Sequence, residues 1–258
     1  MKSVYLYFLV AGVLLSSACS SSRKTTTNNG VIQETVQAKP KTPVYEEEPA
    51  KPKTKTPTKS KTRMLLIETS LGNMIVELFN ETPQHRDNFI KLAKEGFFDD
   101  LLFHRVIRNF MIQGGDPNSR DAAVGQPLGT GGPGYTVPAE FNKDFLHLKG
   151  ALSAARQGDQ VNPQKASSGS QFYIVQGKLE SDEMLNQIQR QKGIEYSTEQ
   201  REAYKTIGGT PFLDMDYTVF GRVVEGLEVI DKIAAVQTDR RAGDRPVENV
   251  TMKVKVIR

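Results

Sequence analysis

From residue 64 onward, short hydrophobic runs alternate with polar positions and turn residues. Two alternating runs, 64–69 and 73–79, flank a Leu71-Gly72 turn and together predict a β-hairpin. Further runs typical of strands lie at 150–154, 171–175, 217–224 and 250–257. The pattern therefore predicts a domain built mainly from short strands.

Helical periodicity is confined to a few segments of this part of the chain. Thr82 at the N-cap, Pro83 at the first helical position and Gly96 as a stop predict one helix, and 227–235 predicts a second. Because helices do not alternate with the strands, a parallel α/β fold is disfavoured. The pattern favours an antiparallel barrel capped at its ends.

Residues 178–209 are predicted to form a helical insertion. Acidic residues follow Ser181, and the segment from Ser197 to Gln200 matches a capping box before a second helical pattern. A helical hairpin that decorates the barrel is the simplest interpretation. The hairpin could shape substrate access or could fill a long loop, and the sequence favours neither.

The first nineteen residues have the pattern of a secretory signal. Lys2 is followed by an apolar run over 4–15, which is too short for the roughly 20 residues that a membrane-spanning helix needs. The small residues before Cys19 resemble a bacterial lipobox, in which the cysteine is acylated, although Ser16 stands where leucine is preferred. A cleaved signal without lipid and an uncleaved anchor are the alternatives. All three place the rest of the chain outside the cytoplasm.

Residues 20–63 are predicted to be a disordered tether. They contain five of the thirteen prolines, many Thr and Lys residues and almost no periodic apolar positions. Their net charge is +6 and Lys2 adds one, so the total of +4 leaves −3 for residues 64–258. The basic balance belongs to the tether, and no nucleic-acid partner is expected. The tether could instead bind acidic lipid or polysaccharide.

Signals for cofactor, metal or nucleophile chemistry are weak. One cysteine and three scattered histidines, His85, His104 and His147, are too few for a disulfide framework or a Cys/His zinc site. The glycine-rich segment 129–134 is not followed by a helix start, as a dinucleotide site requires. The serine-rich segment 167–170 lacks the spacing of a nucleophile elbow. We expect no cofactor and no metal.

The strongest functional pattern lies in residues 103–116. It places a cation at Arg105, large apolar side chains at Phe110 and Met111, and an amide at Gln113 before two glycines. In one continuous strand, Arg105, Met111 and Gln113 would share a face. The alternative is an amphipathic strand with its charged face in solvent.

Residues 64–258 resemble the cyclophilins, the cyclophilin-type peptidyl-prolyl cis-trans isomerases. The resemblance rests on the blocks at 103–116, 169–174, 212–214 and 219–221, which follow the family's order. It implies a closed eight-stranded antiparallel barrel capped by two helices, here with the insertion at 178–209. Domain boundaries at 1–19, 20–63 and 64–258 follow.

The resemblance also implies a mechanism without a nucleophile. Rotation about an X-Pro bond has a barrier of about 18–20 kcal/mol and takes tens to hundreds of seconds unaided. Twisting localises the lone pair on the prolyl nitrogen, and a guanidinium that donates to this nitrogen stabilises the twisted state. Arginine is protonated at cellular pH, so the donor is always available.

The residues that match the family's site fall into two groups. Those matching catalytic positions are Arg105, Phe110 and Gln113. Those matching the proline pocket and the peptide groove are Met111, Ala155, Arg156, Gln157, Gln171, Tyr173, Phe212, Leu213 and Tyr217. Four of these depart from the residue usual in many eukaryotic members: Arg156, Tyr173, Phe212 and Tyr217 replace Asn, Phe, Trp and His. We expect the Tyr173 hydroxyl at the floor of the pocket.

The resemblance implies a monomeric isomerase that acts on proline-containing polypeptides as they fold in the bacterial cell envelope. Lipid on Cys19 would attach it to a membrane, with residues 64–258 in the periplasm or on the cell surface. One alternative is a module or chaperone that binds proline-containing segments without turnover. Another is an adaptor that contacts the membrane surface through the basic tether.

Overall fold

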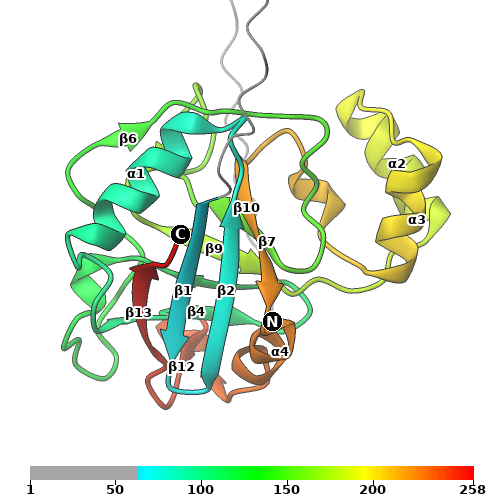
Figure 1. Cartoon of the computed structure of the whole chain (residues 1–258). Helices are drawn as coiled ribbons and strands as arrows, with labels where there is room; N and C mark the ends of the chain where they lie inside the picture. The colour runs from blue at the N-terminus through cyan, green and yellow to red at the C-terminus, as the bar shows by residue number, and fades with distance from the viewer. Residues whose placement is uncertain (1–62) are drawn as a thin grey trace, which may run out of the picture. The chain divides into compact units, whose positions relative to one another are not determined.

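The structure is a computed structural model that describes residues 63–258 (Figure 1). The predicted signal, Cys19 and the tether up to residue 62 lie outside the described residues, whereas Arg63, the predicted last residue of the tether, is the first residue of a strand that pairs with Leu78. The strands are β1 (Arg63–Thr69), β2 (Gly72–Leu78), β3 (Leu101–Leu102), β4 (Arg105–Ile107), β5 (Met111–Gly114), β6 (Thr136–Val137), β7 (Ala151–Ala154), β8 (Ser167–Ser168), β9 (Phe172–Val175), β10 (Val219–Glu225), β11 (Thr238–Asp239), β12 (Arg245–Pro246) and β13 (Thr251–Val256). The helices are α1 (Pro83–Lys94), α2 (Asp182–Lys192), α3 (Thr198–Thr206) and α4 (Leu227–Ala234), with 3-10 turns η1 (Pro117–Ser119), η2 (Pro211–Leu213) and η3 (Arg240–Ala242).

A curled antiparallel sheet forms the body of the domain. Its nine strands run in the order β3-β13-β1-β2-β10-β7-β9-β5-β4, and the pairs β11-β12 and β6-β8 lie outside it. The predicted hairpin is β1 and β2, which pair from Arg63 with Leu78 to Thr69 with Gly72. The predicted strands at 150–154, 171–175, 217–224 and 250–257 correspond to β7, β9, β10 and β13.

The expected closed eight-stranded barrel is corrected in two respects. The sheet has nine strands, and within residues 63–258 its end strands β3 and β4 are not paired with each other. Only Phe103 and His104 separate these strands along the chain. The backbone N–H of Phe103 donates to Val250, and that of Val106 donates to Asp244. The backbone at the two end strands therefore forms hydrogen bonds with the C-terminal part of the chain. The sheet remains open between β3 and β4 and has the form of a curled half-barrel.

Helix α1 begins at the predicted position but is capped in a different way. Thr82 occupies the N-cap, yet its side chain makes no capping hydrogen bond. Instead the Glu140 carboxylate accepts from the backbone N–H of Gln84 at 3.1 Å and of His85 at 3.0 Å. It also lies 2.7 Å from Nδ1 of His85, and burial lowers the pKa of His85 despite this partner. A carboxylate from a distant loop thus supplies the oxygen that the helix N-terminus requires.

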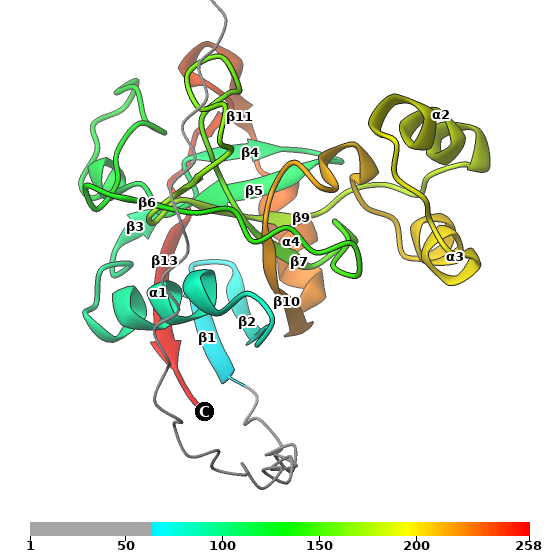
Figure 2. The same cartoon turned by 90° about the horizontal axis from the view of Figure 1, so that it is seen from above.

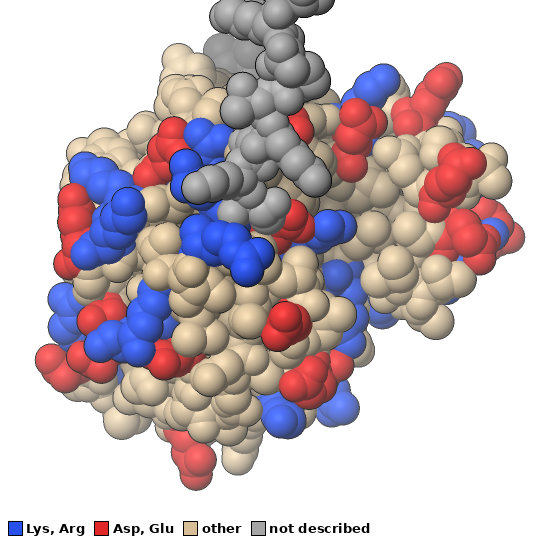
Figure 3. All heavy atoms as spheres, in the orientation of Figure 1, with Lys and Arg blue, Asp and Glu red and all other residues tan. Residues whose placement is uncertain are grey.

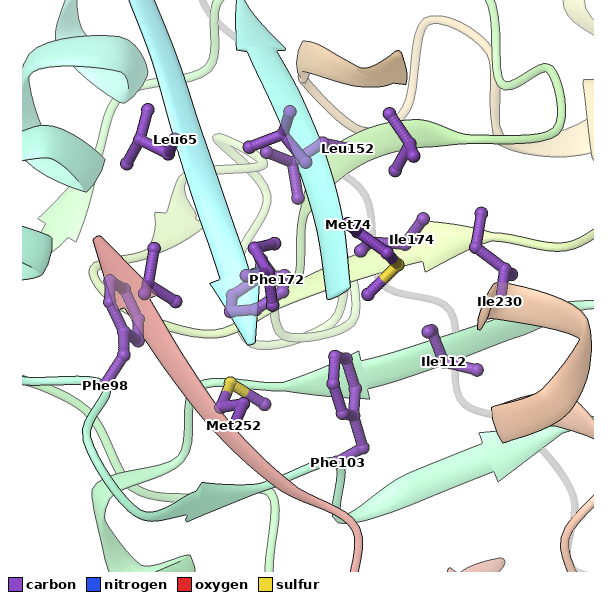
Figure 4. Packing of buried hydrophobic residues seen from close by; sticks show 14 of the residues in the cluster. Leu65, Met74, Phe98, Phe103, Ile112, Leu152, Phe172, Ile174, Ile230 and Met252 are labelled. Carbon is purple, nitrogen blue, oxygen red and sulfur yellow. The ribbon is translucent and has the colours of Figure 1, made fainter. Parts of the chain in front are cut away.

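The main core lies between the sheet and helices α1 and α4. Alternate residues of β1 and β2, including Leu65, Ile67 and Met74, are fully buried, as the period-two pattern requires. Figure 4 shows Phe98, Phe103 and Phe172 with other apolar side chains around these strands. This core fixes the strands that carry the candidate site.

The insertion forms the predicted helical hairpin, with α2 and α3 side by side at one edge of the domain (Figure 2). Ser181 caps α2, and Ser197 with Gln200 forms the predicted capping box on α3. The backbones of Lys178 and Gly209 bridge each other, so the insertion leaves and re-enters the sheet domain at one place. Its own small core contains Leu185, Ile188, Tyr196 and Tyr204.

The surface shown in Figure 3 carries both signs of charge, with Lys and Arg side chains interspersed among Asp and Glu. Across residues 63–258, no helix combines the length and apolar character needed to cross a bilayer.

Candidate active site

The block at 103–116 contains a hairpin and not one continuous strand, which corrects the expectation from parity. Strands β4 and β5 pair antiparallel, with Arg105 opposite Gln113. Asn109 in the connecting turn has φ of +62°, a left-handed conformation that asparagine tolerates better than most residues. Arg105 and Gln113 do face the same side, because they are cross-strand partners.

A pocket of about 120 Å³ opens beside this hairpin. Its lining residues are Arg105, Phe110, Met111, Gln113, Ala155, Arg156, Tyr173, Leu213 and Tyr217. All nine are among the residues selected from the sequence, and they come from β4, β5, β9, η2 and the segments beside β5, β7 and η2. Since one water occupies about 30 Å³ in the liquid, the space suits a group the size of a five-membered ring.

Three of the selected residues lie outside the pocket lining. Gln157 is exposed, and its carbonyl accepts one hydrogen bond from the Arg156 side chain. Phe212 is 49% exposed and lies at the rim, with its ring 5.5 Å from that of Phe110. Gln171 is buried behind Gln113. The pocket and its rim therefore include most, but not all, of the expected peptide groove.

A chain of amide hydrogen bonds orients Arg105. Gln171 Nε2 donates to the carbonyl of Gly131 at 2.7 Å, and Gln113 Nε2 donates to Gln171 Oε1 at 3.1 Å. Arg105 Nη1 then donates to Gln113 Oε1 at 3.2 Å. Each amide uses its donor on one side and its acceptor on the other, so the chain has one direction.

The start of this chain of hydrogen bonds lies in the glycine-rich loop, which no sequence pattern connected with the site. A Cβ at Gly131 would collide with the side chains of Asp116 and Asn118. Only glycine lets this backbone approach closely enough to present its carbonyl to Gln171.

No carboxylate among residues 63–258 forms an ion pair with the Arg105 guanidinium. The only hydrogen bond that its side chain donates within this part of the chain is the one from Nη1 to Gln113. A guanidinium has five N–H donors, so most remain free to face the pocket. The charge is thus oriented by a neutral amide without being neutralised.

Apolar side chains form the opposite wall of the pocket. Met111, Tyr173 and Leu213 are buried in one cluster, against which Phe110 packs. Burial of these side chains favours an apolar ring over water in the same space. The arrangement can hold an apolar ring beside a positively charged hydrogen-bond donor.

The Tyr173 hydroxyl, which the sequence predicts at the floor of the pocket, has a buried hydrogen-bond partner. It lies 2.9 Å from Nε2 of His147, which is fully buried. Burial raises the pKa of Tyr173 well above its usual value. Tyr173 thus lines the pocket while its hydroxyl is bound to a buried histidine.

Arg156 supports another wall of the pocket. Its guanidinium carbon lies 4.5 Å from the centre of the Tyr217 ring, and its Nε donates to the Asp216 carbonyl at 2.7 Å. The same side chain pairs with Asp159 at 2.5 Å and is only 4% exposed. Because these partners occupy the guanidinium, it holds Tyr217 in place.

The three histidines are separated in the structure, as their scatter along the chain indicated. His85 binds Glu140, His147 lies behind Tyr173, and His104 is buried next to the Arg105 strand. Among residues 63–258, no three His, Cys, Asp or Glu side chains gather as a metal site would require.

Comparison with known proteins gives a consistent result. Residues 64–256 match the family described as cyclophilin type peptidyl-prolyl cis-trans isomerase/CLD. A Staphylococcus haemolyticus protein named as a peptidyl-prolyl cis-trans isomerase is 38% identical over 191 residues, covering 72% of this chain and 87% of that protein. A Staphylococcus aureus (strain USA300) protein of the same name is 36% identical over 193 residues, covering 73% and 88%.

Solved structures agree on the fold. A cyclophilin type peptidyl-prolyl cis-trans isomerase from Cryptosporidium parvum superposes with a TM-score of 0.55 at 21% identity, covering 77% of this chain and 99% of that one. A second structure of that protein, obtained in the presence of the dipeptide Ala-Pro, gives a TM-score of 0.54.

Proposed function

The chain belongs to the cyclophilin-type peptidyl-prolyl cis-trans isomerases, and on that basis we propose that Arg105 catalyses X-Pro bond rotation in proteins folding in the cell envelope. The activity of the protein is that of a peptidyl-prolyl cis-trans isomerase. The proposal concerns which residues perform the reaction, on which polypeptides, and in which compartment.

The proposed chemistry begins with the prolyl ring in the 120 Å³ pocket. Met111, Leu213 and the Tyr173 ring hold the ring still while the residue before it rotates. As the bond twists, amide resonance is lost and the lone pair of the prolyl nitrogen becomes localised on that atom. A free N–H of Arg105 donates to this nitrogen, an interaction that is stronger in the twisted state than in the planar one.

The amide chain behind Arg105 reduces the cost of this step. Gln113 fixes Nη1, so the remaining donors do not need to reorganise when the lone pair localises on the prolyl nitrogen. The Gln113 amide has further donor and acceptor capacity, with which it can hold the peptide backbone next to the proline.

The observation that carries the proposal is the guanidinium of Arg105, oriented by Gln113 and paired with no carboxylate in the described chain, at the edge of an apolar pocket. A proline-limited refolding assay tests it with residues 63–258. The wild type should accelerate the slow, proline-limited phase of refolding. In Arg105→Ala the catalytic rate should be about 100-fold lower, which is the usual cost of removing a hydrogen-bond donor to the transition state. Wild-type protein that binds peptide but does not accelerate refolding would instead indicate a binding module.

The proposed location rests on the sequence of residues 1–63. The apolar run that ends at Cys19 and the basic, proline-rich segment after it suit a lipid-anchored domain held away from the membrane. We place the domain in the periplasm or on the cell surface. Palmitate labelling of the full chain should be lost in Cys19→Ala, and unchanged labelling would contradict the anchor.

A further inference from the structure

A buried hydrogen-bond network joins the helical insertion to the pocket, and Asp214 is its centre. Asp214 follows Leu213 directly and is only 2% exposed. Its Oδ1 accepts from the backbone N–H of His147 at 2.9 Å and lies 2.8 Å from His147 Nδ1. Its Oδ2 accepts from the hydroxyls of Tyr196 at 2.8 Å and Tyr204 at 2.6 Å.

These four contacts satisfy the Asp214 carboxylate completely. A carboxylate offers about four lone-pair sites, and each of them has a donor here. With Nδ1–H donating to Asp214, Nε2 of His147 accepts, and the Tyr173 hydroxyl donates to it at 2.9 Å. A buried charge is costly unless such donors surround it. Two of the four donors, Tyr196 and Tyr204, come from the insertion.

The insertion also holds the backbone that carries Leu213. The Tyr196 hydroxyl lies 3.3 Å from the Pro211 carbonyl at the start of η2. Lys192 Nζ donates to the Asp214 carbonyl at 2.8 Å and forms an ion pair with Asp216. The backbone carbonyl directly after Leu213 is therefore held by a side chain of the insertion, and the Tyr196 hydroxyl lies close to the carbonyl that precedes it.

Two walls of the pocket thus depend on the same buried carboxylate. Leu213 is attached to it through the backbone, and Tyr173 is attached through His147. Resting on the proposed function of the pocket, we propose that Tyr196 and Tyr204 are positioning residues, through which the insertion sets the shape of the proline pocket and its affinity for the prolyl ring. The insertion is then part of the substrate-binding machinery and not a loop filler.

The variants Tyr196→Phe and Tyr204→Phe test this inference, because each keeps the buried ring and removes one donor to Asp214. The affinity for a tetrapeptide with one Ala-Pro bond should fall about fivefold to tenfold in each variant. The pocket contacts the ring in the planar and twisted states alike, so the turnover rate of bound peptide should change less than about twofold. NMR titration and exchange measurements give the two quantities separately.

Tyr135→Phe is a control for the loss of a tyrosine hydroxyl outside this network, at an exposed position. Tyr135 also donates a short hydrogen bond, to Asn88 at 2.6 Å, but it does not line the pocket. This variant should bind the tetrapeptide like the wild type. Equal loss of affinity in Tyr135→Phe and Tyr204→Phe would show a general effect of losing a hydroxyl and would overturn the inference.

A double-mutant cycle tests the path from the insertion to the pocket. Tyr173→Phe and Tyr204→Phe remove opposite ends of the network, so their effects on peptide affinity should be non-additive. Additive effects would contradict coupling through His147 and Asp214. Unchanged affinity in active Tyr196→Phe and Tyr204→Phe proteins would overturn this inference but leave the proposed function intact. An inactive wild type would overturn the proposed function.

Discussion

His104, which precedes Arg105 in the chain, should make the fold sensitive to acid. It is 3% exposed, and neither ring nitrogen has a hydrogen-bond partner of normal geometry in the described part of the chain. Burial lowers the pKa of His104 from 6.5 to about 4, although the nearby Asp116 attracts the charged form. The folded protein therefore keeps the His104 ring neutral between about pH 4 and pH 6.5, where the same ring is protonated in the unfolded chain.

The sign and size of the effect follow from this difference. Because the folded-state pKa is lower, the contribution of His104 is fully present above pH 6.5 and is lost as the pH falls toward about 4. Each unit of pKa difference corresponds to about 1.4 kcal/mol. Between pH 8 and pH 5 the unfolding free energy should fall by about 2 kcal/mol on account of His104 alone.

Urea denaturation at pH 8 and pH 5 measures this loss, with His104→Leu as the comparison. The variant has no titrating group at this position, so its unfolding free energy should fall by about 2 kcal/mol less than that of the wild type. His85 remains in the variant, and burial lowers its pKa too, so some pH dependence should persist. An identical fall in both proteins would refute the assignment to His104.

Two further substitutions test parts of the scaffold that hold the site. Gln171→Leu breaks the link between Gln113 and the Gly131 carbonyl. Losing the orientation of Gln113 should lower kcat/KM about fivefold, and unchanged kinetics would contradict the orienting chain. Glu140→Ala removes the carboxylate that caps α1 and binds His85, and should lower the unfolding free energy by about 1–2 kcal/mol in urea, with a smaller loss for Glu140→Gln. Equal stability of Glu140→Ala and the wild type would contradict the capping role.

Local sequence patterns predicted most of the elements. The β1-β2 hairpin follows from alternation around a glycine turn, and α2 and α3 follow from the serine caps at 181 and 197. These patterns work because caps, turns and side-chain periodicity involve residues only a few positions apart. The turn between β4 and β5 was missed, although Asn109 between two apolar runs was a usable signal.

Interactions between distant residues could not be predicted in this way. Asp214 and His147 lie 67 residues apart in sequence, and Gln171 lies 40 residues from Gly131. The resemblance supplied the residues that line the pocket but not the partners that hold them. As a result, the histidine that binds the Tyr173 hydroxyl was not foreseen, and Thr82 was given the capping role that Glu140 performs.

The most direct test of the central claim compares wild type, Arg105→Lys and Arg105→Ala on one Ala-Pro tetrapeptide, with binding and turnover measured separately by NMR. Because Arg105 should act on the twisted state, both variants should bind the peptide nearly as the wild type does. Turnover should fall about 100-fold in Arg105→Ala and by a smaller factor in Arg105→Lys, which keeps the charge without the planar fork. Turnover that remains at the wild-type level in Arg105→Ala would contradict the catalytic role of Arg105.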